Sequence, residues 1–229
     1  MRRWWLIALL ALLLAACSQA ASPLPLRAPW SEEAEETAYV ITRAADGKEV
    51  GRATFIVRRE GDAYVLDQRF TLGVMDDHIV ARVRADDLKP LGGTREVIGT
   101  TNDFTLTTTY EGNKLAIKAK TKDGDKAATI TVPADAYDND TLLMILRGLP
   151  WAAGWEGRFT NVVAANALQV KIGLKVVGQE TWETPQGRVE TWHLRMTIGQ
   201  QHQDMWYDVE PPHLLRKYDN GTTVFTLVP

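Results

Sequence analysis

Histidines are the residues of this chain best suited to metal binding or acid-base chemistry. There are four, namely His78, His193, His202 and His213, and none has the H-E-x-x-H spacing of a metal site. His78 follows Asp76 and Asp77 in a predicted turn, which could offer mixed metal ligands, although a polar hairpin tip explains the triplet better. His193 and His202 could meet across a hairpin, but alternation puts both on a polar face, where solvated histidines are expected. We predict no metal and no cofactor.

Nucleophile motifs are equally sparse. Serines occur only at Ser18, Ser22 and Ser31, near the N-terminus, and the chain has neither a G-x-S-x-G elbow nor a glycine-rich phosphate loop. The 29 Asp and Glu residues leave open a carboxylate pair of the glycosidase kind, since sequence does not give their separation. We expect a protein that is not an enzyme, with a carboxylate enzyme as a weaker alternative.

Cys17 is the only cysteine, so no disulfide can form within the chain. It follows Arg2, Arg3 and an apolar stretch over residues 6–14, which together are typical of a secretory signal peptide. The stretch is too short to span a bilayer, which takes roughly 20 apolar residues. Leu14-Ala15-Ala16-Cys17 resembles the bacterial lipobox, in which the signal is cut before the cysteine and the thiol receives lipid. The resemblance implies a lipoprotein that carries acyl chains such as palmitate on Cys17. An incidental thiol is the alternative.

The chain divides into three parts on this interpretation. Residues 1–16 are the lipoprotein signal peptide, residues 17–36 a lipidated tether, and residues 37–229 a single antiparallel β domain. The tether holds three prolines and an acidic cluster, which favour an extended, solvated segment. The formal net charge of −3 becomes −5 once Arg2 and Arg3 are removed, which argues against nucleic acid as a partner.

Period-two alternation dominates from Thr37 onward. Apolar and polar residues alternate over several segments, and glycine or Asx residues separate these segments as in tight hairpin turns; the clearest are 53–58, 63–70, 79–84, 103–110, 114–120, 168–176 and 192–198. Further strands are predicted over 203–209, 214–218 and 222–228. Such a long antiparallel meander is expected to curl into a half-barrel or an incomplete barrel, because curling removes exposed sheet edges.

One segment breaks the alternation. Residues 140–148 begin with a capping aspartate, end with glycine and are apolar on every side between them, which predicts a short helix packed at the mouth or in the concavity of the sheet. A plug that fills one end of the concave side explains it; a movable lid over an apolar cavity is the alternative. Trp151 and Trp155 follow the helix and either pack at its exit or form an aromatic rim.

The wide apolar face and the apolar helix favour a non-catalytic module that binds an apolar, lipid-like ligand. The residues predicted to line its site are Leu142, Met144, Ile145, Ile172, Leu174, Trp192, Leu194 and Met196. The alternative is a structural or interaction protein of the cell envelope, with a solid core that docks a protein partner.

The chain resembles a family of exported bacterial proteins, domain of unknown function 3108, over residues 37–228. The resemblance lies in Tyr39-Val40-Ile41, residues 46–51, Leu146-Arg147-Gly148-Leu149-Pro150, residues 176–180, residues 184–187 and Met205-Trp206-Tyr207-Asp208; it implies no known activity. The expected architecture is also similar to the bacterial lipoprotein carriers and receptors of the LolA and LolB type, which bind acyl chains in a half-barrel.

These inferences predict a location outside the cytoplasm. The partners expected are the membrane, through lipid on Cys17, and either an apolar ligand or an envelope protein. Ser18, in place of the aspartate that often retains lipoproteins at the inner membrane, favours the periplasmic side of the outer membrane in an organism with two membranes.

Overall fold

A computed structural model describes residues 22–184 and 187–228. Within these residues the chain forms fifteen strands, one α-helix and three short 3-10 turns. The strands are β1 (Glu35–Arg43), β2 (Glu49–Glu60), β3 (Ala63–Leu72), β4 (Met75–Arg84), β5 (Pro90–Ile98), β6 (Phe104–Glu111), β7 (Lys114–Thr121), β8 (Gly124–Thr131), β9 (Ala136–Asp138), β10 (Glu156–Val163), β11 (Leu168–Thr184), β12 (Gly187–Ile198), β13 (Gln201–Asp208), β14 (Leu215–Asp219) and β15 (Thr223–Leu227). The helical elements are η1 (Asn139–Thr141), α1 (Leu142–Ile145), η2 (Leu146–Gly148) and η3 (Ala164–Asn166). None of the described helices is long and apolar enough to cross a membrane.

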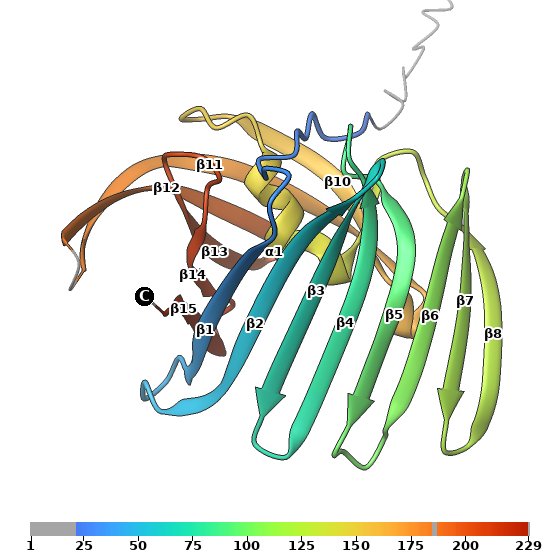
Figure 1. Cartoon of the computed structure of the whole chain (residues 1–229). Coiled ribbons are helices and arrows are strands. Elements are labelled where there is room, and N and C mark those ends of the chain that lie inside the picture. The colour runs from blue at the N-terminus through green and yellow to red at the C-terminus, as the bar shows by residue number, and fades with distance from the viewer. Residues whose placement is uncertain (1–21, 185–186, 229) are drawn as a thin grey trace, which may run out of the picture.

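All fifteen strands belong to one sheet, in the order β8-β7-β6-β5-β4-β3-β2-β1-β15-β14-β13-β12-β11-β10-β9. Two antiparallel meanders therefore meet where β1 pairs with β15, and the sheet stays open, with β8 and β9 at its edges (Figure 1). The predicted mainly β fold, a curled meander short of a closed barrel with one short helix, is confirmed. One pairing departs from the antiparallel prediction, because β9 runs parallel to β10.

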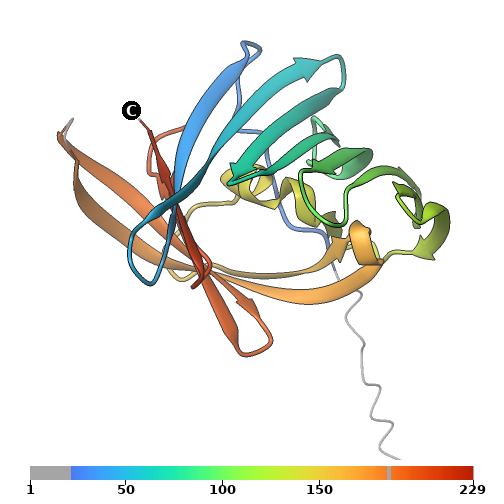
Figure 2. The same cartoon turned by 90° about the horizontal axis from the view of Figure 1, so that it is seen from below.

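The curled sheet encloses α1 in its concavity. Seen from below, α1 lies between β1–β4 on one side and β10–β12 on the other (Figure 2). In β2 the buried Ala53, Phe55 and Val57 alternate with less buried residues. Leu66, Phe159 and Val176 belong to the same core, which also includes the helix. Burial on several sides explains why α1 has no polar face.

A second, smaller core closes the seam between the two edges of the sheet. Leu106, Leu115 and Ile117 of β6 and β7 pack with Val162 and Ala164 across the gap from β8 to β9. The Gln169 side chain also donates a hydrogen bond of 2.9 Å to the Thr131 carbonyl of β8. The wing formed by β6–β8 is thus fastened to the second meander by side chains rather than by backbone pairing.

The N-terminal segment differs from the solvated tether predicted over residues 17–36. Residues 23–30, here called the strap, cross one end of the sheet beside α1 and bury Leu24, Leu26 and Trp30 in the main core (Figure 1). β1 already begins at Glu35. The segment is not solvated, because burial of its apolar residues outweighs the solvation that its prolines and acidic residues favour.

Candidate functional site

The eight residues predicted to line an apolar site do come together. Leu142, Met144 and Ile145 extend from α1, and the remaining five lie on the inner faces of β11 and β12. Seven of them are at most 5% exposed, and Trp192 packs against the same core, partly buried. The chain itself therefore covers this face.

The strap is also buried on the concave side. Leu24, Leu26 and Trp30 are at most 7% exposed and belong to the same core as the eight predicted residues. The Trp30 ring lies 5.0 Å from that of Tyr64, measured between centroids. The part of the concave side that Leu24, Leu26 and Trp30 cover is called the strap groove below.

Few polar contacts hold the strap. The Arg27 amide donates a hydrogen bond of 2.9 Å to the Gly148 carbonyl. The Tyr64 hydroxyl donates a hydrogen bond of 3.3 Å to the Trp30 carbonyl, and the Tyr137 hydroxyl donates one of the same length to the Leu24 carbonyl. The buried Nε1 of Trp30 has no hydrogen-bond partner. An unsatisfied buried donor costs about 1–3 kcal/mol, so the strap is anchored mainly by apolar contact.

Gly148 marks the closest approach between the strap and the helical segment. A Cβ placed there would lie 2.3 Å from the Arg27 carbonyl oxygen, a distance that no real contact allows. Only glycine lets the strap pass this close to the end of η2. A methyl group at residue 148 should therefore displace the strap.

Arg147 joins the helical segment to the start of the sheet. Its guanidinium, 4% exposed, forms two bonds of 2.5 and 2.8 Å with the Glu35 carboxylate and also donates to the Pro212 carbonyl. It lies 5.6 Å from the Trp30 ring centroid. This paired charge fixes η2 against β1 and against the loop that precedes β14.

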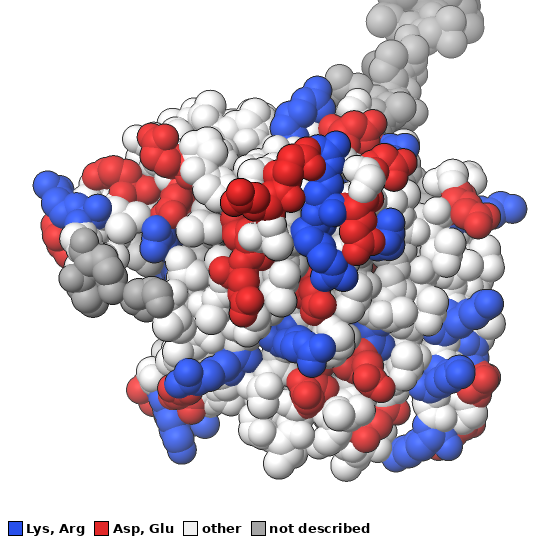
Figure 3. Space-filling view, viewed as in Figure 1, with Lys and Arg blue, Asp and Glu red and all other residues white. Residues whose placement is uncertain are grey.

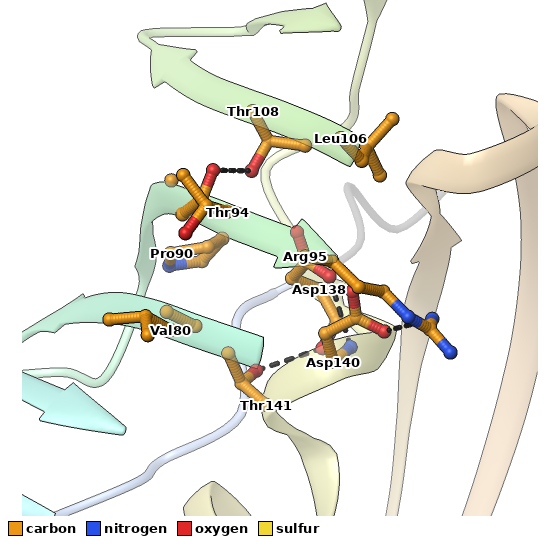
Figure 4. A pocket seen from close by; sticks show the side chains of 12 residues that line it. Val80, Pro90, Thr94, Arg95, Leu106, Thr108, Asp138, Asp140 and Thr141 are labelled. Atoms are coloured by element: carbon orange, nitrogen blue, oxygen red, sulfur yellow. Dashed lines mark hydrogen bonds and ion pairs between the residues drawn. The ribbon is translucent and has the colours of Figure 1, made fainter. Parts of the chain in front are cut away.

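A cluster of acidic residues lies on the inner face between the two cores (Figure 4). Arg95 bonds both oxygens of Asp77, at 2.9 and 2.6 Å, and reaches Asp140 at 3.0 Å. The Tyr110 hydroxyl donates a hydrogen bond of 2.8 Å to one carboxylate oxygen of Asp138. The other carboxylate oxygen accepts a hydrogen bond of 3.0 Å from the Asp140 amide. These bonds attach β9 and η1 to β4, β5 and β6.

Burial controls the protonation of this cluster. It raises the pKa of Asp138 to about 7, and the neighbouring Asp140 carboxylate adds to the effect. Burial also raises the pKa of Asp140, although Arg95 opposes it. The cavity beside these residues measures about 10 Å³, which holds about one water molecule. Asp138 and Asp140 thus line a space with room for about one water molecule.

A larger pocket, of about 300 Å³, lies beside the start of the strap. It is formed by the β4–β5 and β6–β7 turns and the loop before β9, and its lining residues include Pro23, Arg84, Asp87, Lys89 and Tyr110. Lys89 Nζ donates hydrogen bonds of 2.7 and 3.0 Å to the carbonyls of Ala134 and Ala136. It also lies 3.8 Å from the centroid of the Tyr137 ring. Burial lowers the pKa of Lys89 to about 8.

His202 is exposed as predicted, whereas His78 and His193 are placed differently from the prediction. His78 lies within β4 rather than in a turn, and its Nε2 is 2.9 Å from Asp67. His193 does lie on the outer face, but it is 7% exposed, because Trp206 stacks on it at 4.8 Å. Its Nε2 bonds Asp204 at 2.6 Å. Among the described residues no group of three or more His, Cys, Asp or Glu side chains is arranged so that it could hold a metal ion.

Trp151 and Trp155 pack against the main core, partly buried. Trp151 lies 6.3 Å from Trp192 with the rings near parallel, and its Nε1 donates 3.1 Å to the Arg147 carbonyl. Packing at the helix exit thus accounts for both residues better than an aromatic rim. Cys17 and the predicted signal peptide lie outside the described residues.

Basic and acidic side chains interleave over the outer face of β2–β4 (Figure 3). Glu60 contacts both Arg58, at 3.1 Å, and Arg82, at 2.8 Å, and Arg58 also reaches Asp67 at 3.8 Å. Exposed pairs of this kind contribute about 0–1 kcal/mol each. This surface therefore carries a mixed charge pattern rather than a field of one sign.

Comparison with known proteins agrees with this fold. No curated protein matches the chain. Among solved structures it is similar to the crystal structure of a β-barrel-like protein of domain of unknown function DUF1849 from Brucella abortus, with a TM-score of 0.62 and 12% identity over 87% of this chain and 97% of that one. At that identity the likeness concerns the fold alone. The profile of the DUF3108 family matches residues 38–228, which confirms the resemblance seen in the sequence: the chain belongs to this family of proteins of unknown function.

Proposed function

We propose that this protein is exported, anchored by lipid on Cys17 and non-catalytic, and that it binds an extended apolar ligand, such as an acyl chain, in the strap groove. The signal features around Cys17 support export and anchoring. They favour the periplasmic side of the outer membrane in an organism with two membranes. The membrane is then one partner and the apolar ligand the other.

The observation that carries this proposal is the strap itself. An extended segment without helix or strand lies in the groove and inserts three apolar side chains, with few polar contacts of its own. The strap groove therefore holds this segment through its apolar side chains and not through a regular set of backbone hydrogen bonds. An acyl chain offers the same apolar surface and needs no hydrogen-bond partners.

The energies allow exchange between strap and ligand. Burial of Leu24, Leu26 and Trp30 contributes roughly 1.5–3 kcal/mol each, or about 6 kcal/mol together. An acyl chain gains about 0.8 kcal/mol per buried CH₂, so about eight CH₂ groups offset the loss of the strap. With longer acyl chains, burial of the chain exceeds the burial lost with the strap, and this excess offsets the entropy cost of association.

The test uses Gly148→Ala, which pushes against the strap from the opposite wall. Because a Cβ there would lie 2.3 Å from the Arg27 carbonyl oxygen, the strap should leave the groove more readily, and a fluorescent fatty acid should bind several-fold more tightly. Gly178→Ala is the matched control, since nothing lies within 4 Å of its Cβ. Equal affinity in both variants, or no binding in either, contradicts the proposal.

A second candidate function, docking of an envelope protein, is favoured by one observation. Val74 is 86% exposed and Ile98 47%, and both lie at the end of the sheet opposite the strap. Apolar residues exposed on hairpin tips are suited to contact with a protein. A photo-crosslinker placed at Val74 in cells tests this function, and recovery of no crosslinked protein counts against it.

A further inference from the structure

Lys89 is a cation without a carboxylate partner. Among the described residues no acidic oxygen lies within ion-pair distance of its Nζ, which instead bonds two backbone carbonyls at 2.7 and 3.0 Å. An ammonium group has three N–H donors, and beyond the two carbonyls the ammonium contacts the face of the Tyr137 ring, whose centroid lies 3.8 Å from Nζ. A half-buried charge without a counterion is unfavourable, and a bound anion would relieve that cost.

The nearest acidic residues are already engaged elsewhere. Asp87 forms an ion pair with Arg84, with one contact at 3.0 Å, and accepts the Lys89 amide at 3.0 Å. Asp135 is buried and binds Lys171 and the Thr160 hydroxyl, each at 3.0 Å. Both carboxylates stabilise the Lys89 ammonium from beyond ion-pair distance, while their own direct bonds go to these other partners.

The pocket around Lys89 adjoins the strap groove. Pro23 lines the pocket, and the next residue, Leu24, is buried in the main core. Tyr137 links the two, since Lys89 Nζ lies over its ring and its hydroxyl donates to the Leu24 carbonyl. At about 300 Å³ the pocket has the size of a small ligand site.

We propose that this pocket binds the anionic head of an amphiphile, a carboxylate or a phosphate, through Lys89 Nζ, while its apolar chain replaces the strap in the adjoining groove. This inference rests on the proposed function and names the class of its ligand. Arg84, paired with Asp87, lies at the rim of the same pocket and adds a second cation near the head group. A neutral amphiphile of equal chain length would leave Lys89 without a counterion.

The experiment compares palmitic acid with palmityl alcohol as competitors of a fluorescent fatty acid. The protein is residues 18–229, which keeps every described residue. Palmitic acid should displace the probe about tenfold more effectively than the alcohol. In Lys89→Met this advantage should disappear, whereas Lys89→Arg and the exposed control Lys118→Met should keep it. Circular dichroism checks that each variant folds.

The outcomes separate this inference from the proposed function. Equal displacement by acid and alcohol in the wild-type protein overturns the role of Lys89 without needing any variant, and leaves the groove intact. An advantage of the acid that survives in folded Lys89→Met overturns it as well. If neither compound nor the probe binds, the proposed function fails. Displacement of the probe by millimolar inorganic phosphate alone would identify a free anion as the ligand and overturn the amphiphile.

Discussion

Replacing Asp138 with asparagine should make this protein more stable at neutral pH. Asp138 is 6% exposed, and its carboxylate accepts bonds from the Tyr110 hydroxyl and the Asp140 amide. Asparagine keeps an oxygen for the Asp140 amide, and its NH₂ group can donate to the Tyr110 oxygen instead. The substitution thus removes the charge and keeps the shape and both hydrogen bonds.

The size of the effect follows from the raised pKa. Folding moves the pKa of Asp138 from 3.8 to about 7, and each pKa unit corresponds to about 1.4 kcal/mol, so the upper bound is about 4 kcal/mol. Because the Asp138 carboxyl ionises less readily in the folded chain than in the unfolded chain, the free energy of unfolding falls as the pH rises. Its stabilising contribution is complete below pH 4, falls as the pH rises to 7 and is absent above it. The nearby Asp140 shares part of this titration.

Urea unfolding between pH 4 and pH 8 measures the effect. Relative to the wild type, Asp138→Asn should gain up to about 4 kcal/mol at pH 8 compared with pH 4. Asp103→Asn is a control whose stability relative to the wild type should change with pH in the opposite direction, because hydrogen bonds from Thr100 lower the pKa of Asp103. Parallel stability profiles for wild type and Asp138→Asn would refute the reasoning, since they would mean that Asp138 titrates alike in the folded and unfolded chain.

Three further predictions concern other parts of the fold. Arg147→Met should destabilise the protein by about 3 kcal/mol, and Arg147→Met combined with Glu35→Gln by less, because the double variant leaves no unpaired charge; chemical denaturation of the single and double variants decides this. Gly148→Ala should cost about 1–3 kcal/mol through overpacking, whereas Gly178→Ala should stay within about 0.5 kcal/mol, and a larger loss in the second variant would contradict the strap contact. Val74→Lys should leave the unfolding midpoint unchanged, since an exposed tip residue contributes within about 0.5 kcal/mol, and a marked loss in thermal unfolding would show that Val74 is packed.

Alternation was sufficient to predict the fold. Residues 63–70 and 192–198 are both strands as predicted. Their burial does not alternate strictly, because Val65 and His193 are buried as well. β8 went unrecognised because almost all of its residues are exposed. β5 was missed because proline and two glycines near its start weaken the pattern.

The site was only partly predictable. The eight apolar residues share one core, because the strand residues among them lie on the inner face of the sheet and the helix packs against that face. The strap could have been recognised from Leu24, Leu26 and Trp30, apolar residues that a solvated tether does not need, but proline and acidic content outweighed them. The role of Lys89 could not be predicted from the sequence, because the two carbonyls that its Nζ contacts belong to Ala134 and Ala136, 45 and 47 residues further along the chain. Asp138 and Tyr110 likewise meet only through folding, 28 residues apart.

The central claim, that the strap groove binds an apolar ligand, is tested most directly by native mass spectrometry of residues 18–229 after incubation with palmitic acid and removal of the excess. The account predicts a complex with one fatty acid per chain that disappears on denaturation and is more abundant in Gly148→Ala than in Gly178→Ala. An unliganded mass in all three proteins would contradict it and would mean that the strap is a permanent part of a solid core.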